Sequence, residues 1–233
     1  MRGGAAGAKD GASVAIFAKT PLAGRVKTRL VPPLTPREAA GVARACLEET
    51  LGRFPARVPA AWTLFLDGAP DEGLRAAAAG GGASIEPQGA GDLGARLERA
   101  FEKLRGEGAR RIVAIGADSP TLPPERIGEA LEFLRSRDAV IGPAEDGGYY
   151  LVGLSREAGD LFRDTPWGTG DVARVTAERA LARGLTLERL PSWYDVDDGP
   201  SLRRLVNETR AGGYPALARM IAEIGLERFD APA

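Results

Sequence analysis

Short runs of apolar, β-prone residues alternate along the chain with longer stretches whose apolar residues recur at helical spacing. The runs predict strands at 13–18, 61–67, 84–87, 112–117, 139–143, 149–154 and 185–190. Helices are predicted at 35–53, 71–79 and 88–105, from 124, after 170, from 200 and at 214–226. This order of strands and helices predicts an α/β fold: a mostly parallel, doubly wound sheet with helices on both faces, a three-layer α/β/α sandwich.

The connection between the first strand and the first helix, residues 19–34, is longer than most strand-to-helix loops. Around Gly24 it contains four cations, which are Lys19, Arg25, Lys27 and Arg29. Glycine admits close backbone approach and the cations neutralise oxygens, so the loop is predicted to bind phosphate. It lacks the spacing of a Walker loop, and a solvated basic loop remains the alternative.

The predicted strand at 112–117 runs directly into a carboxylate, Asp118, which Ser119 and Pro120 follow. Ligands of open α/β sheets bind beyond the carboxyl ends of the strands, which makes Asp118 a candidate for contact with metal or substrate. As an alternative, the aspartate caps the turn or the helix that follows.

Two further acidic segments follow apolar runs later in the chain. The first is the turn Glu145-Asp146-Gly147-Gly148, which either brings Asp146 toward the same pocket as Asp118 or only joins two strands. The second contains Asp195, Asp197 and Asp198. In a parallel sheet these segments and the cationic loop lie on one rim, where two carboxylates and a phosphate oxygen form a typical magnesium site.

The composition of the chain indicates its general class and excludes several kinds of catalytic and metal site. With 233 residues, 44% hydrophobic and 27% charged, the chain fits one globular domain over 13–233, after a disordered tail at 1–12. The net charge of -1 gives no sign of nucleic-acid binding, and no apolar run is long enough for a signal peptide or a membrane span, so we expect a cytoplasmic protein. Because histidine is absent and Cys46 is the single cysteine, Ser-His-Asp triads and the usual zinc sites are excluded.

Six motifs resemble those of the DUF2064 family of glycosyltransferase-A-fold, radical-SAM/selenodomain-associated transferases: FAKTPLAGRVKTRL, QGAGDLGARLERAF, IGADSPTL, GPAEDGGYYLVGL, PWGTGDVARVT and DVDDGPSL. The resemblance implies a nucleotide-diphospho-sugar transferase-like fold with Asp118 at the metal position. Glycosyltransferases of this fold usually show Asp-x-Asp, whereas here one carboxylate precedes Ser119-Pro120, a pattern closer to nucleotidyltransferases. The element Lys27-Thr28-Arg29-Leu30 also looks like the phosphate loop of phospholactate guanylyltransferases.

Three hypotheses follow: glycosyl transfer from a nucleotide diphospho-sugar, nucleotidyl transfer with release of pyrophosphate, and a nucleotide-binding protein without catalysis. We assign Mg²⁺ or Mn²⁺ to Asp118 and Asp197, preferring Asp197 over Asp195, and catalysis to Asp118 and Asp146. The expected partners are a nucleotide sugar or nucleoside triphosphate and a small-molecule acceptor. The residues assigned to substrate binding are Glu145, Gly147, Gly148 and Tyr149.

Overall fold

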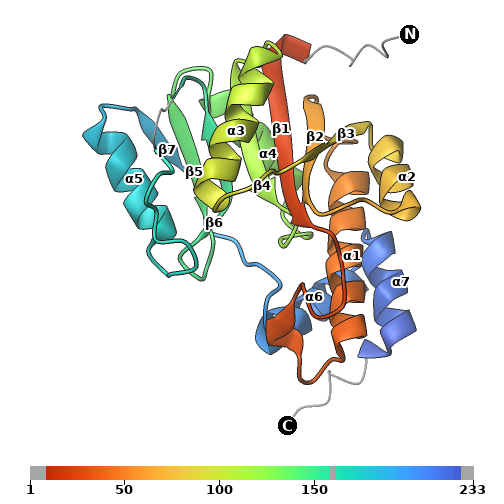
Figure 1. Cartoon of the computed structure of the whole chain (residues 1–233). Helices are drawn as coiled ribbons and strands as arrows, with labels where there is room; N and C mark the ends of the chain where they lie inside the picture. The colour runs from red at the N-terminus through yellow and green to blue at the C-terminus, as the bar shows by residue number, and fades with distance from the viewer. Residues whose placement is uncertain (1–8, 158–160, 227–233) are drawn as a thin grey trace.

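The computed structural model describes residues 9–157 and 161–226, in which seven strands form one sheet in the order β3-β2-β1-β4-β6-β5-β7 (Figure 1). The strands are β1 (Ala12–Lys19), β2 (Ala61–Asp67), β3 (Ala83–Pro87), β4 (Arg111–Gly116), β5 (Ala139–Pro143), β6 (Tyr149–Leu154) and β7 (Leu187–Arg189). All neighbours are parallel except β6, which runs antiparallel to β4 and β5. A short acidic turn joins β5 to β6, and a connection of that length cannot cross the sheet to give a parallel pair.

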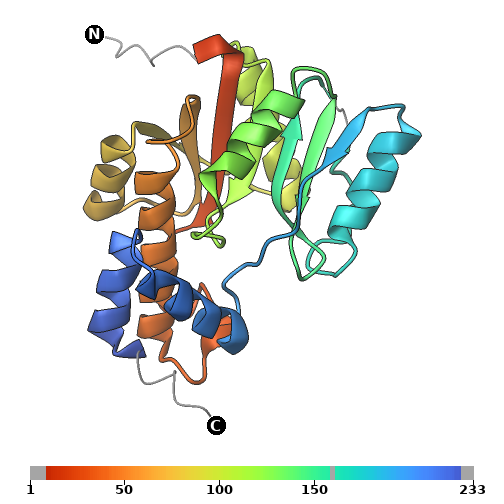
Figure 2. The same cartoon turned by 180° about the vertical axis from the view of Figure 1, so that it is seen from behind.

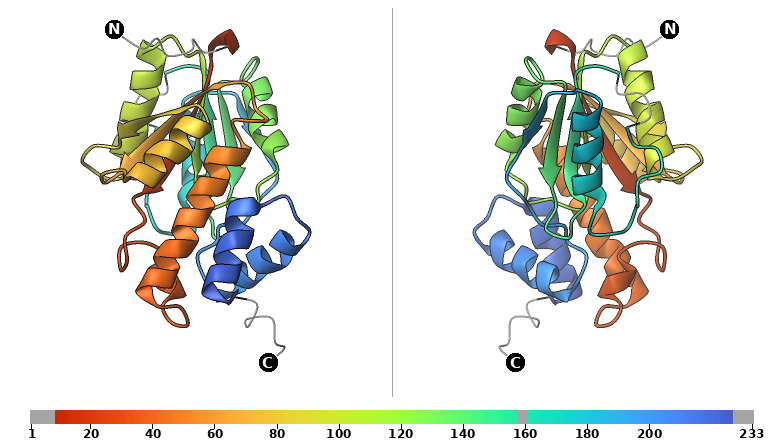
Figure 3. Two further views of the ribbon diagram at one scale, coloured as in Figure 1. Left: turned by 90° about the vertical axis from the view of Figure 1, so that its right-hand side faces the viewer. Right: turned by 90° about the vertical axis from the view of Figure 1, so that its left-hand side faces the viewer.

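Helices cover both faces of the sheet, which confirms the predicted three layers (Figure 3). They are α1 (Pro36–Arg53), α2 (Glu72–Gly80), α3 (Leu93–Gly106), α4 (Pro124–Phe133), α5 (Val172–Ala182), α6 (Gly199–Arg210) and α7 (Pro215–Ile224). Side chains of α1, α2 and α4 pack on one face, and those of α3 and α5 pack on the other. Successive residues of β4 alternate between the two apolar clusters, as a strand buried on both faces requires.

A third apolar cluster lies beyond the carboxyl end of the sheet, where α6 and α7 pack against the first half of α1 (Figure 2). Besides these helices it includes Leu30, from the 3-10 turn η2 (Thr28–Leu30), and Tyr194 and Val196. The cluster therefore fixes the first loop and the late acidic segment at the same end of the sheet.

Some boundaries differ from the predicted ones. Helix α3 begins at Leu93 rather than 88, because the Asp92 side chain accepts a hydrogen bond from the backbone N–H of Ala95 and ends the preceding loop. Part of the expected tail, residues 9–11, forms the 3-10 turn η1 (Lys9–Gly11), and residues 1–8 lie outside the described part of the chain.

Candidate functional site

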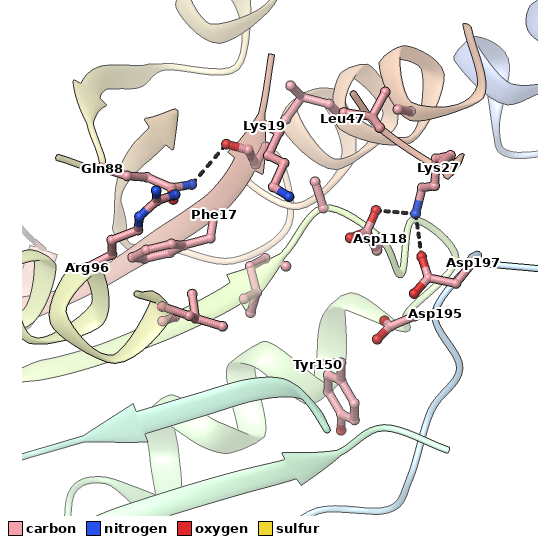
Figure 4. Close-up of a pocket in the computed structure, with 18 of the residues that line it drawn as sticks. Phe17, Lys19, Lys27, Leu47, Gln88, Arg96, Asp118, Tyr150, Asp195 and Asp197 are labelled. Carbon is pink, nitrogen blue, oxygen red and sulfur yellow. Dashed lines mark hydrogen bonds and ion pairs between the residues drawn. The ribbon is translucent and has the colours of Figure 1, made fainter. Parts of the chain in front are cut away.

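A cavity of about 650 Å³ opens at the carboxyl edge of the sheet (Figure 4). Its walls come from the end of β1 and the loop after it, the end of β4, the start of α3 and the segment after β7. Of the residues predicted to form a site, it gathers Lys19, Arg25, Lys27, Arg29, Asp118, Tyr149 and Asp197. The topology thus brings the cationic loop and both predicted metal ligands together.

Lys27 lies at the centre of the charged end of this cavity. Its backbone is left-handed, with φ of 48°, and Leu30 anchors the turn that follows it in the third apolar cluster. The Lys27 ammonium contacts both Asp118 and Asp197, at 3.1 Å from Oδ1 of Asp197 (Figure 4). Burial of Lys27 acts to lower the pKa of its ammonium, but the two carboxylates outweigh burial and raise that pKa above its ordinary value.

The segment after β7 delivers two carboxylates to the cavity by strand-like alternation. Tyr194 and Val196 point into the third apolar cluster, whereas Asp195 and Asp197 line the cavity. The backbone N–H of Val196 donates to the carbonyl oxygen of Asp118 at 2.8 Å, which ties this segment directly to the end of β4.

The two carboxylates of this segment differ in protonation. Burial raises the pKa of Asp195 to about 7, although a hydrogen bond from the Ser119 hydroxyl opposes the change. Burial would likewise raise the pKa of Asp197, but the charges of Lys27 and Arg29 outweigh it and lower that pKa. Near neutral pH Asp197 is therefore the fully ionised partner, which agrees with its preference over Asp195 as a metal ligand.

The other cations of the loop surround this pair. Arg29 is 65% exposed and forms an ion pair with Asp197. Lys19 and Arg25 face the cavity and form no ion pair with any residue that the structure describes. Gly24 lies outside the cavity lining, and its φ of +77° permits the turn that carries Arg25.

Asp146 does not enter this cavity, contrary to the expectation that it would approach Asp118. With Glu145 it lines a second hollow of about 370 Å³, which shares Arg29, Asp195 and Asp197 with the first. The segment after β7 forms a wall common to both spaces, and the backbone N–H of Glu145 donates to the carbonyl oxygen of Trp193 in that segment at 2.9 Å.

The second hollow is acidic. Among the described residues that line it, the acidic ones are Glu145 and several aspartates, and the only cations are Arg29 and Arg204. Both arginines are already ion-paired: Arg29 pairs with Asp197, and Arg204 pairs with Glu145 at 3.1 Å.

Gly147 and Gly148 line neither space. Gly147 has φ of +89°, and a Cβ there would lie 2.0 Å from the carbonyl oxygen of Gly170. Its own carbonyl oxygen accepts a hydrogen bond from the backbone N–H of Ala173 at 3.0 Å. This glycine therefore joins the acidic turn to the start of α5.

The end of the main cavity away from the carboxylates was not singled out in the sequence. There Arg96 is held in place, donating from Nη1 to Asp67 at 2.8 Å and to Gln88 at 3.0 Å, and from Nε to the carbonyl oxygen of Gly91 at 3.0 Å. The side chains of Phe17 and Leu93 also line this end. The glycines of the motif QGAGDLGARL indicate a loop before the helix, but the helix predicted from residue 88 included the residues of that loop, which forms this wall.

Within the described residues, no group of three or more histidine, cysteine, aspartate or glutamate side chains is arranged to hold a metal ion. Within this part of the chain, the two predicted ligands Asp118 and Asp197 are therefore a pair and not a complete coordination shell. Among these residues, no helix is both long and apolar enough to span a membrane.

Comparisons with known proteins agree with this architecture. Residues 50–169 match the model of a family described as an uncharacterized protein conserved in bacteria (DUF2064). The 2-phospho-L-lactate guanylyltransferase of Methanothermobacter thermautotrophicus is 30% identical over 184 residues, which are 77% of this chain and 78% of that protein.

Two solved structures show the same fold. A Desulfovibrio desulfuricans G20 protein assigned to the nucleotide-diphospho-sugar transferases has a TM-score of 0.83 at 30% identity, covering 95% of this chain and 99% of that one. CMP:2-keto-3-deoxy-manno-octonic acid synthetase complexed with CTP has a TM-score of 0.54 at 14% identity, covering 86% and 98%. The predicted nucleotide-diphospho-sugar transferase-like fold is therefore confirmed.

Proposed function

The chain belongs to the DUF2064 family, and we propose that it is a metal-dependent transferase that passes a glycosyl group from a nucleotide diphospho-sugar to a small-molecule acceptor. The observation that carries this proposal is the convergence of Asp118 and Asp197 on one cation beside a cavity of about 650 Å³. Its fold is shared with transferases that act on nucleotides.

Asp118 and Asp197 would hold the divalent metal, Mg²⁺ or Mn²⁺. The pair fits such an ion because oxygens of both side chains already converge on the Lys27 ammonium, a cation in the corresponding place. Carboxylate oxygens are the preferred ligands of both metals, and phosphate oxygens and waters commonly complete their shells. When bound, the metal would neutralise charge on the departing diphosphate.

The donor would lie along the main cavity. Lys19 and Arg25 form no ion pair within residues 9–157 and 161–226, and they would neutralise phosphate oxygens together with Lys27 and Arg29. The nucleobase would occupy the opposite end, against Phe17, Leu93 and the guanidinium of Arg96, whose Nη2 donates to no residue that the structure describes. Because Gly24 lies outside the lining, we propose that it acts by shaping the loop.

The acceptor would enter from the second hollow, which reaches the same carboxylates. Glu145 would bind acceptor hydroxyls, and Asp146 would take the proton of the attacking hydroxyl as its oxygen bonds to the sugar and the bond to diphosphate breaks. Tyr149 would contact the donor in the main cavity. Gly147 and Gly148 would contribute by holding the acidic turn.

Guanylyl transfer with release of pyrophosphate is the second candidate, and the 30% identical 2-phospho-L-lactate guanylyltransferase favours it. In that reaction a phosphorylated acceptor attacks a nucleoside triphosphate. The second hollow opposes such an acceptor, because its two arginines are already ion-paired and carboxylates dominate the remaining charge.

A screen of nucleotide sugars and nucleoside triphosphates by thermal shift, with Mg²⁺ or Mn²⁺, tests the proposal. We expect a nucleotide diphospho-sugar to bind with metal, and Asp118→Asn to abolish that metal-dependent binding with little change in thermal midpoint. Asp171→Asn is the control, since its side chain is 57% exposed against 54% for Asp118. Release of nucleoside diphosphate on turnover supports glycosyl transfer, pyrophosphate indicates nucleotidyl transfer, and binding without turnover indicates a non-catalytic protein.

A further inference from the structure

We propose that Lys27 is a built-in counter-ion that keeps a divalent metal out of the site until polyphosphate arrives, so that metal and nucleotide bind together. This inference rests on the proposed function, because it takes Asp118 and Asp197 as the metal ligands. It adds a coupling between metal binding and nucleotide binding that two carboxylate ligands alone do not impose.

Lys27 and a metal cannot occupy this place together. The Lys27 side chain is 3% exposed, and its ammonium already bonds to Oδ1 of Asp118 and Oδ1 of Asp197. A metal bound by the same oxygens would lie about 2.0–2.6 Å from each of them. The ammonium nitrogen fills that space, so metal binding requires the lysine side chain to move.

The lysine is also held by its surroundings. Val26 and Leu30, on either side of it, are buried, and they fix the loop from which the ammonium reaches the carboxylates. The other oxygen of Asp197, Oδ2, is taken by Arg29. Before a metal can bind, this carboxylate must therefore lose at least one of its two cationic partners.

Phosphate can supply the new anionic partner that Lys27 needs when its ammonium leaves the two carboxylates. An ammonium released from two carboxylates in a buried place needs another anion, since an unpaired buried charge is costly. Lys19 and Arg25 face the same cavity without an ion-pair partner in the described part of the chain, so they would draw polyphosphate next to Lys27. The polyphosphate oxygens would then pair with the Lys27 ammonium, and they would also contribute the metal ligands that the described residues lack.

Such a switch requires positive coupling between metal and polyphosphate, and by linkage the coupling acts equally in both directions. Removing the Lys27 ammonium should therefore improve the binding of metal alone while weakening that of polyphosphate. This combination distinguishes a competing counter-ion from a residue that only binds phosphate, whose loss would leave metal affinity unchanged.

Equilibrium dialysis of Mn²⁺ against the full chain, with and without inorganic tripolyphosphate, tests the inference. For the wild type we expect weak binding of Mn²⁺ alone and at least about tenfold tighter binding with tripolyphosphate. Lys27→Met should bind Mn²⁺ alone at least about tenfold more tightly than the wild type. Lys19→Met is the matched control, because Lys19 lines the same cavity without contacting either carboxylate, and it should bind Mn²⁺ alone like the wild type.

A thermal-shift series with MnCl₂ alone gives a second readout that needs no turnover. Mn²⁺ should raise the thermal midpoint of Lys27→Met and leave that of the wild type nearly unchanged. The inference is overturned if wild type and Lys27→Met bind Mn²⁺ alone equally, or if the variant binds it more weakly. If Lys27→Met does not fold, the wild type alone still tests the inference: it is overturned if the wild type binds Mn²⁺ as tightly without tripolyphosphate as with it. Since no sugar or acceptor is used, these results are independent of which transfer reaction the protein catalyses.

Discussion

Replacing Asp195 by asparagine is expected to stabilise the protein at neutral and alkaline pH. Burial raises the pKa of this carboxyl from an ordinary 3.8 to about 7, so the folded chain keeps a proton that the unfolded chain has already released. A raised pKa contributes stability that is fully present below about pH 4 and is lost as the pH rises through about 7. Above that range the folded protein carries the cost of a buried, ionised Asp195.

The size of this cost follows from the difference in pKa. A difference of about three corresponds to about 4 kcal/mol at pH values above 7, and some relaxation around the ionised group leaves a range of about 2–4 kcal/mol. Asparagine never ionises, and its side-chain oxygen still accepts the hydrogen bond from Ser119. The difference in unfolding free energy between Asp195→Asn and the wild type should therefore increase gradually between pH 4 and pH 7.

Urea unfolding followed by tryptophan fluorescence, at several pH values from 4.5 to 8.5 with EDTA present, measures this difference in unfolding free energy. Asp171→Asn is the comparison for the chemical change itself, because that carboxylate is exposed. If the advantage of Asp195→Asn is the same at pH 5 and pH 8, or if the variant is the less stable protein at pH 8, the reasoning from burial is wrong.

Two further predictions concern ligand binding and folding. Arg96→Met should weaken nucleotide binding about tenfold or more while leaving tripolyphosphate binding unchanged, whereas Arg29→Ala should weaken both. Calorimetry measures each affinity. If Arg96→Met weakens nucleotide and tripolyphosphate binding equally, Arg96 does not bind the base. Gly147→Ala should cost about 2–4 kcal/mol in urea unfolding, because φ is +89° and the new Cβ would meet Gly170 at 2.0–2.5 Å. Gly148→Ala, with no positive φ and an Asp146 oxygen at 3.1 Å as its nearest contact, should cost much less, and similar costs would refute the packing argument.

Much of the fold follows from the sequence because local signals agree with the global pattern. Thr35 and Glu38 form the expected capping box at the start of α1, and β2 and β5 begin and end where their apolar runs predict. The antiparallel direction of β6 is less accessible, since an apolar run has the same pattern in either direction. It depends on the length of the acidic turn before it.

The candidate site was predictable in part. Strand ends place Asp118 at the carboxyl edge, but they do not indicate that the segment after β7 reaches the end of β4, nor that Asp146 lines the second hollow rather than the main cavity. That path is fixed by long-range packing of Tyr194 and Val196 against α1, α6 and α7. For the same reason the contact of Lys27 with both carboxylates could not be read from spacing along the chain.

The third apolar cluster has a consequence for the order in which the molecule becomes competent during synthesis. Every strand of the sheet is complete once residue 189 has been added, yet Asp195 and Asp197 and the helices that hold their segment come later. A nascent chain that ends just after β7 can therefore form a sheet while its lysine loop lacks both part of its apolar anchor and one of its carboxylate partners. The chain acquires its layered body first, and the pocket takes its final form only with its last two helices.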